Sequence, residues 1–315
     1  MKNFSYKDIS KLAGVSISTI SRYYNGGYVS KATKQKITKI VKEHNYYPNH
    51  GARLIRGRDN SIFVIAPEWF ESAYTHIMNG IEQGAKLHDK KVLITYSSSN
   101  IEEYIESIKY VLSWKPGSVV FFLPSDPSKK IVEYLKQNLG DIPAIIYGQN
   151  EELFNCITID FEDAFEKLTT RFVHFIEKGQ KIIYAEDGKL NEEQKEARLS
   201  GFKKACKKLN IEYEICTLKN KDPKQIHQFL NNLRLNNHVN VVCSTHEVFV
   251  SLISSQDKNL RLTDIGWLSI FDYQHKYKTK IFLDYPEIGL IMEKILFNNI
   301  IDGTMESKII KPRIV

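Results

Sequence analysis

Residues 12–25 read LAGVSISTISRYYN and contain a turn between two short helices. The turn falls at Gly14 and Val15, and glycine between two short helices is common. Ser16 then starts the second helix, because its hydroxyl accepts a hydrogen bond from the backbone of the first turn. This pattern predicts either an ordinary helical hairpin or a helix-turn-helix, and the surrounding residues favour the second.

The second helix of this segment is rich in hydroxyl side chains. Serine and threonine are poor choices inside a solvated helix, where their hydroxyls compete for backbone partners, but they suit a helix laid on phosphates. The helical period leaves Ile17, Ser18 and Arg22 away from the apolar Ile20, free to meet base edges. Arg22 suits the N7 and O6 atoms of guanine, with a phosphate contact as the alternative. The predicted contacts to the DNA backbone are Tyr6, Ser16, Thr19, Ser21, Asn25 and Lys31.

Basic residues are concentrated at the start of the chain. Residues 1–58 contain 12 Lys and Arg but only two acidic residues, which gives them a net charge of about +10. The whole chain of 315 residues carries +7, so residues 59–315 are slightly acidic. This asymmetry is typical of a nucleic-acid-binding module joined to a nearly neutral body.

Capping residues predict the helices of this basic part. Ser5 can cap a first helix over about 6–13, and the second helix runs over about 16–24. Ser30 can cap a third helix over about 31–44, whose apolar face closes a three-helix core.

From residue 61 the pattern changes to apolar runs separated by helical stretches. Nearly continuous apolar runs are typical of strands buried on both faces of a parallel sheet. The runs cover 61–67, 90–97, 117–124, 143–148, 156–160, 180–186, 212–218, 240–244, 263–269 and 280–284. The sequence therefore predicts an α/β fold with two doubly wound subdomains and a ligand cleft at the carboxyl ends of their strands.

Composition and motifs limit the class of protein. No apolar run approaches the roughly 20 residues needed to span a bilayer, and the start of the chain lacks the features of a signal peptide. We therefore expect a cytoplasmic protein without a membrane partner. No phosphate-binding or dinucleotide-binding glycine motif is present, so we expect no enzymatic activity and no cofactor. Cys243 and His246 have a metal-like spacing but supply only two ligands, so we expect no metal. The four cysteines, Cys156, Cys206, Cys216 and Cys243, are far apart in the sequence and form no C-x-x-C motif. This spacing predicts reduced, buried thiols.

The first 60 residues closely resemble the lac-repressor/galactose-repressor family of transcription factors. The matching segments are LAGVS, STISR, the lysine-rich third helix, NYYPN and ARLIRG. The resemblance implies a homodimer whose recognition helices enter successive major grooves of a near-palindromic operator in double-stranded DNA. It also implies a hinge helix over about 50–56 that inserts an apolar side chain into the minor groove, where Ile55 aligns with the family's leucine. A helix this short is expected to fold only on binding.

The remainder resembles the family's effector domain, which is similar to periplasmic binding proteins. The implied domains are a head with its hinge helix, 1–58, and an effector-binding and dimerisation domain, 59–315. The first subdomain would comprise about 60–158 and 286–315, and the second about 159–285.

Candidate effector contacts follow from this resemblance and from the strand ends. Arg198 matches the family's R-x-x-G pattern, whose arginine reaches the ligand, and a guanidinium suits sugar hydroxyls, a carboxylate or a phosphate. The alternative for Arg198 is a surface arginine. Asp160 lies where the family often carries an acidic residue at the cleft. Trp69 and Phe70 follow the first strand and either stack on a sugar or belong to the core or dimer contact, and Tyr147 ends another strand.

Two departures from the family pattern concern the ligand. The family's Asn-Asp is here Thr245-His246, and its Gly-Tyr-Asp-Asp is here residues 266–269, GWLS. Those acidic residues usually hold sugar hydroxyls, so the ligand is expected to differ from an unmodified sugar held in the usual way. A phosphorylated sugar is one option, with His246 either helping to bind it or acting as a capping or core residue. The second subdomain and the closing KIIKPRIV resemble the trehalose repressor branch.

These patterns predict a sequence-specific DNA-binding repressor of carbohydrate-use genes, with a sugar or sugar-phosphate effector in the cleft between the subdomains. The alternative is a regulator controlled by a phosphorylated carrier protein, as in the catabolite-control branch. The sequence leaves open whether the effector releases or strengthens DNA binding.

Overall fold

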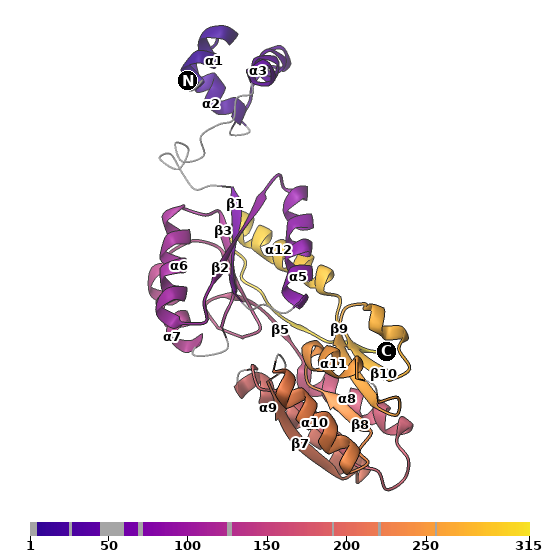
Figure 1. The fold of residues 1–315 in the computed structure, drawn as a ribbon. Helices are drawn as coiled ribbons and strands as arrows, with labels where there is room; N and C mark the ends of the chain where they lie inside the picture. Colours follow the sequence, from indigo (N-terminus) through magenta and orange to yellow (C-terminus); the bar gives the residue numbers. More distant parts are fainter. Residues whose placement is uncertain are drawn as a thin grey trace. The chain divides into compact units, whose positions relative to one another are not determined.

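The computed structural model describes residues 5–24, 27–44, 60–68, 72–124, 128–190, 192–219, 222–255 and 257–315. The chain divides into two compact units, Met1–Asp59, here called the head, and Asn60–Val315, here called the body (Figure 1).

Among its described residues, 5–24 and 27–44, the head contains three short helices, α1 (Tyr6–Ala13), α2 (Ile17–Tyr24) and α3 (Lys31–Glu43). A capping box starts α1, in which the Ser5 hydroxyl accepts from the Asp8 amide and the Asp8 carboxylate accepts from the Ser5 amide. Gly14 ends α1 in the left-handed conformation, with φ of 64°. These three predicted helices are confirmed to within one residue at each end, whereas the predicted hinge helix lies outside the described residues. The small core consists of Ile9, Ala13, Ile20, Ile37 and Ile40.

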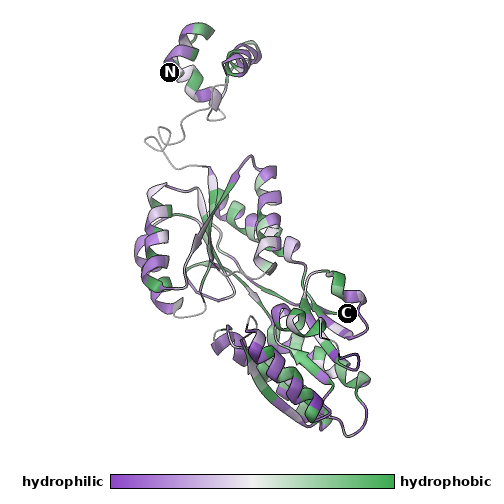
Figure 2. Cartoon of the chain, in the orientation of Figure 1, coloured by the Kyte–Doolittle hydropathy of each residue, from purple (hydrophilic) through white to green (hydrophobic). Residues whose placement is uncertain are grey.

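The first subdomain of the body is built on a parallel six-stranded sheet with the order β11-β5-β4-β3-β1-β2. Helices α5 and α12 cover one face of it, and α6 and α7 cover the other. Hydrophobic residues run along the central strands (Figure 2). The strands are β1 (Ser61–Pro67), β2 (Lys91–Ser97), β3 (Ser118–Phe122), β4 (Ala144–Tyr147), β5 (Asn155–Ile159) and β11 (Ser307–Ile310). The helices are α5 (Ser72–Leu87), α6 (Ile101–Ser113), α7 (Ser128–Asn138) and α12 (Tyr285–Asp302).

The second subdomain has a sheet of the same size, with the order β12-β10-β9-β8-β6-β7, in which β12 pairs antiparallel with β10 and the other described pairings are parallel. Helices α8 and α9 pack on one face, and α10 and α11 on the other. The strands are β6 (Ile182–Asp187), β7 (Tyr213–Leu218), β8 (Asn240–Cys243), β9 (Arg261–Gly266), β10 (Tyr277–Phe282) and β12 (Arg313–Ile314). The helices are α8 (Phe161–Phe172), α9 (Glu192–Leu209), α10 (Pro223–Leu235) and α11 (His246–Ile253), with 3-10 turns η2 (Val173–Phe175) and η3 (Ile270–Tyr273).

The α/β prediction with two doubly wound subdomains is confirmed, with two differences in detail. The run 90–97 was predicted to be buried on both faces, but β2 is an edge strand whose apolar side chains are partly exposed, Leu93 on one face and Ile94 and Tyr96 on the other. Leu93, Ile94 and Tyr96 are 43%, 45% and 50% exposed, because no strand follows β2 in the sheet. Residues 286–315 were also assigned wholly to the first subdomain, whereas β12 pairs with β10 in the second sheet.

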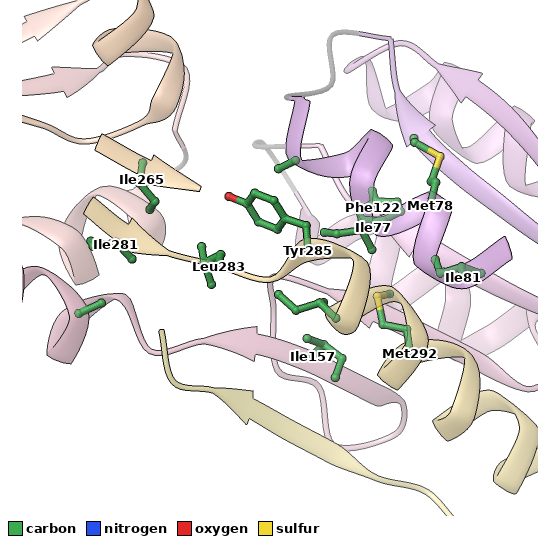
Figure 3. Close-up of a cluster of buried hydrophobic side chains, with 14 of the residues drawn as sticks. Ile77, Met78, Ile81, Phe122, Ile157, Ile265, Ile281, Leu283, Tyr285 and Met292 are labelled. Atoms are coloured by element: carbon green, nitrogen blue, oxygen red, sulfur yellow. The ribbon is translucent and has the colours of Figure 1, made fainter. Parts of the chain in front are cut away.

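The chain passes between the subdomains three times, between β5 and α8, between β10 and α12, and between β11 and β12. The second passage is apolar. Figure 3 shows Leu283 and Tyr285 lying between Ile265 and Ile281 of the second sheet and Ile77 of α5, within one continuous buried cluster. The two subdomains therefore share part of their hydrophobic core.

Helices α5 and α12 approach each other so closely that their contact is made by glycine. A Cβ atom at Gly80 would collide with the backbone carbonyl of Pro286, and one at Gly289 with that of Ile77. Only glycine lets two helix backbones come this near.

The described cysteines are all free thiols, and three of the four are buried, with Cys216 half-buried. Within the described ranges, no helix combines the length and the apolar character that crossing a membrane requires.

Candidate functional site

The outward face of α2 carries the three side chains predicted to contact bases. Ile20 is fully buried in the head core, which fixes the rotation of the helix about its axis. Ile17 is 45% exposed on the other side, and Ser18 and Arg22 are exposed with it. The structure thus brings Ile17, Ser18 and Arg22 to the solvent side of one short helix.

Hydroxyl groups cluster at the start of α2. The Ser16 hydroxyl accepts from the Thr19 amide at 3.2 Å, which makes Ser16 the predicted cap. It also lies 2.7 Å from the Ser18 hydroxyl and 2.9 Å from the Thr19 hydroxyl. The start of a helix carries partial positive charge, so these groups lie where an anionic backbone is favoured.

The other predicted DNA contacts are placed less uniformly. Tyr6 is half-buried, and its ring stacks on Tyr24 with centroids 5.2 Å apart. Ser21 is half-buried, and Lys31 is exposed at the first residue of α3. Asn25 and Ile55 lie outside the described residues.

A cavity of about 280 Å³ lies between the two subdomains of the body. Its walls come from the carboxyl ends of strands in both sheets and from the first turns of several helices, which is where ligands bind in open α/β sheets. The first subdomain contributes Tyr74, Tyr147 and Thr158, and the second contributes Arg198, His246 and Trp267.

Arg198 is held against the cavity by stacking. Only 5% of the residue is exposed, and its guanidinium carbon lies 3.7 Å from the centroid of the Phe161 ring at the start of α8. Gly201, three residues later on α9, allows this approach, because a Cβ atom there would collide with the carbonyl of Glu162 on α8. The R-x-x-G spacing thus lets the two helices touch while the arginine stacks beside the cavity.

His246 begins α11 and is anchored from behind. The Thr245 hydroxyl caps this helix, and Nδ1 of His246 lies 2.8 Å from Oδ1 of Asp264 on β9. Asp264 is fully buried, and its Oδ2 lies 3.0 Å from Nζ of Lys280 on β10, which is itself only 1% exposed. Lys280 also contacts Oδ1 of Asp272 at 2.6 Å.

These partners shift the acid–base behaviour of the histidine. Burial and, to a smaller extent, the charge of Lys280 lower the pKa of His246, but the hydrogen bond and charge of Asp264, together with the charge of Glu247, outweigh them, so this pKa lies above its ordinary value. Burial also raises the pKa of Glu247.

Among the predicted effector contacts, Tyr147, Arg198 and His246 line the cavity. Asp160 is not among the lining residues, and its carboxylate instead caps α8 by accepting from the Asp163 amide at 3.2 Å. Trp69 and Phe70 lie outside the described residues. The lining residues Tyr74 and Tyr285 were not predicted, and neither was the Asp264–Lys280 pair. The available signal for this pair was a charged residue within each of two strand-like stretches.

Comparison with known families matches both units. Residues 5–49 match the family model described as bacterial regulatory proteins, lacI family. Residues 59–239, more than half of the chain, match the model described as periplasmic binding proteins and sugar binding domain of the LacI family. The chain belongs to the lacI family. The predicted resemblance is therefore confirmed at the level of the family, and the nearness to the trehalose repressor branch stays a prediction.

Two curated relatives of this lacI-family chain come from Staphylococcus xylosus. The sucrose operon repressor is 34% identical over 158 residues, which cover 50% of this chain and 48% of the relative. Catabolite control protein A is 30% identical over 200 residues, covering 62% of this chain and 59% of the relative. The lacI-family chain thus spans about half of the first relative's length and somewhat more of the second's. Both relatives are regulators by name, not enzymes.

A solved structure extends the comparison to the whole fold. The lac repressor dimer bound to operator and the anti-inducer ONPF superposes with a TM-score of 0.80 at 17% identity, covering 100% of this chain and 98% of that one. At this identity the similarity shows that the lacI-family chain shares the fold.

Proposed function

We propose that this chain is a sequence-specific DNA-binding transcriptional repressor of carbohydrate-use genes. The observation that carries the proposal is the exposed face of α2, where Ile17, Ser18 and Arg22 project from a strongly basic head. A helix with such a face fits the major groove, and the net charge of the head supplies attraction to phosphates. The sucrose operon repressor among the relatives supports a carbohydrate role.

The repressor acts as a homodimer on a near-palindromic operator. Support comes from β2, whose exposed Leu93, Ile94 and Tyr96 form an apolar edge that water solvates poorly. Edge strands of this kind need covering, and a second copy of the chain would cover this one. Two-fold symmetry of the protein then requires two half-sites in the DNA.

A sugar or sugar phosphate in the cavity controls operator binding. The cavity combines aromatic faces, from Tyr74, Tyr147 and Trp267, with the charged Arg198 and His246, and this mixture suits a polar ring compound. Because three chain passages join the subdomains, a ligand that contacts both of them favours one relative arrangement. That preference alters how the two heads of a dimer meet DNA, with the hinge segment around Ile55 inserting into the minor groove.

Operator binding with and without sugars tests this function. We would select binding fragments from genomic DNA with the full chain and measure affinity by mobility shift across a panel of sugars and sugar phosphates. We expect a near-palindromic operator bound by a dimer, and at least one panel member that changes its affinity several-fold. Failure to prefer any fragment over random duplex would contradict the proposal.

Control by a phosphorylated carrier protein is the second candidate, supported by the match to catabolite control protein A. Affinity capture from lysate with the full chain as bait, in the presence and absence of sugar, separates the two. A phosphoprotein retained without sugar, together with no sugar effect on operator binding, would favour carrier control.

A further inference from the structure

A buried charge cluster underlies one wall of the cavity. Lys280 and Asp264 are cross-strand neighbours on β10 and β9, and both are almost completely buried. The Lys280 ammonium contacts both Asp264 and Asp272 and also donates to the carbonyl of Trp267 at 2.7 Å. Because Trp267 and His246 both line the cavity, the cluster supports two lining residues at once.

The charges of this cluster balance only when His246 is protonated. Asp264 and Asp272 bring two negative charges, whereas Lys280 brings one positive charge. An imidazolium at His246 supplies the missing positive charge, 2.8 Å from Asp264. Buried clusters favour neutrality, because an unbalanced charge in a low-dielectric interior is costly.

The geometry also decides which ring atom of His246 meets a ligand. Asp264 engages Nδ1, and no hydrogen bond engages Nε2 within the part of the chain that the structure describes. A carboxylate partner keeps the proton on Nδ1, so Nε2 accepts hydrogen bonds when the ring is neutral and donates when it is charged. The His246 side chain is 25% exposed and borders the cavity.

Other charged groups near this wall do not offset the positive charge that His246 presents to the cavity through Nε2. Arg198 adds a second positive charge to the lining. Glu193 is exposed at the cavity rim, and burial raises the pKa of Glu247, which makes its carboxylate easier to protonate. Asp187, near Glu247, accepts from the Thr245 hydroxyl at 2.9 Å and from the Lys189 amide at 2.9 Å.

We propose that His246 is a specificity-determining residue that binds an oxyanion of the effector, either a phosphate ester or a carboxylate, and that Asp264 and Lys280 are its positioning residues. This inference rests on the proposed function, because it takes the cavity as the effector site. Arg198 faces the same cavity and provides a second cationic contact. Anion binding is then linked to protonation of His246 and weakens as the pH rises.

Sulfate is a suitable probe, because its charge is constant over the range in which histidine titrates. We would measure sulfate binding to the full chain by calorimetry at about pH 6 and about pH 8.5. We expect affinity to fall at least about five-fold between these two pH values, because one proton is linked to binding. No saturable sulfate binding, or equal binding at both pH values, would overturn the inference.

Two variants separate a charge role from a structural one. His246→Gln keeps the buried Lys280 pairs intact and should abolish the pH dependence. Asp264→Asn leaves Lys280 paired with Asp272 and should move the midpoint of the pH dependence to lower pH, since the carboxylate that favours the imidazolium is gone. Equal weakening at both pH values in Asp264→Asn would show a structural role only and contradict the assignment.

Glucose 6-phosphate, glucuronate and glucose distinguish the source of the oxyanion. Tighter binding of one of the two anions than of glucose, lost in His246→Gln, supports the inference and identifies the group. If neutral sugars alter operator binding while His246→Gln leaves every affinity unchanged, this inference fails and the proposed function stands. If His246-dependent anion binding never alters operator affinity, the inference stands and the proposed effector control fails.

Discussion

The exposed face of α2 and the cavity of the body are built in different ways. The α2 face is local, because Ile17, Ser18 and Arg22 lie within six consecutive residues and one buried residue, Ile20, sets their direction. The cavity is assembled from segments between Ala73 and Tyr285, and its His246 is supported by a lysine 34 positions along the chain. A substitution should therefore affect only its own unit in the head, whereas in the body a substitution far from the cavity should alter the cavity.

The largest effect is expected where the cavity is assembled. Lys280→Met removes the buried ammonium that pairs with both Asp264 and Asp272, which should lower the free energy of unfolding of the body by about 3–5 kcal/mol. Denaturant unfolding of the full chain measures this. The double variant Lys280→Met with Asp264→Asn is the control and should recover much of the loss. If Lys280→Met changes stability by less than about 1 kcal/mol, the pair is not a support of the cavity.

A core change in the head should be nearly as large but confined. Ile20→Ala removes a fully buried side chain from the small core of the head and should lower the free energy of unfolding of the head by about 2–5 kcal/mol. Because head and body are separate compact units, the unfolding transition of the body should not move. Scanning calorimetry that shows both transitions shifting together would break the distinction between a local and an assembled site.

Arg22 and Lys31 of the head should contact different parts of the DNA, Arg22 a base edge and Lys31 a phosphate. Arg22→Ala should reduce discrimination between operator and random duplex by about 1–3 kcal/mol if the side chain reads a base edge. Lys31→Ala is the matched control and should weaken both duplexes equally while lowering the salt dependence. Mobility shifts at several salt concentrations report both effects. If Arg22→Ala loses the same affinity for both duplexes, Arg22 contacts a phosphate and not a base edge.

The smallest effect is a pH dependence of the stability of the body. Since the pKa of His246 is raised in the folded chain, protonation favours the folded state. This stabilisation is complete below the unfolded pKa of about 6.5 and is lost as the pH rises through the folded value. The melting temperature of His246→Gln should therefore fall further below that of the unsubstituted chain at acid pH than at alkaline pH. The opposite trend would show that Asp264 does not favour the imidazolium.

The fold could be predicted where its signals are local. Caps and helical periodicity predicted the head helices to within a residue, because Ser5 and Ser30 start helices, and Gly14 ends one, through interactions with residues a few positions away. Apolar runs located the central strands in the same way. The order of strands in a sheet is not local, so the exposed edge at β2 was not predicted. The short, partly polar β11 and β12 were missed, since pairing with distant strands defines them.

The site was predictable only in part. Arg198 was predicted from the family pattern, His246 from a departure from that pattern and Tyr147 from the end of a strand, and all three line the cavity. Asp264 and Lys280 were missed, because a charged residue in a strand suggests a solvent-facing position unless its partner is known. Their partnership depends on the register between β9 and β10, which places them side by side.

The glycine contact between α5 and α12 affects how a mutational survey should be interpreted. Gly80 and Gly289 are not among the residues that line the cavity, yet neither position has room for a methyl group. A deep scan scored by reporter expression would record both as intolerant and rank them beside genuine contact residues. Measuring protein abundance in parallel would separate these spacer positions from residues that meet a ligand.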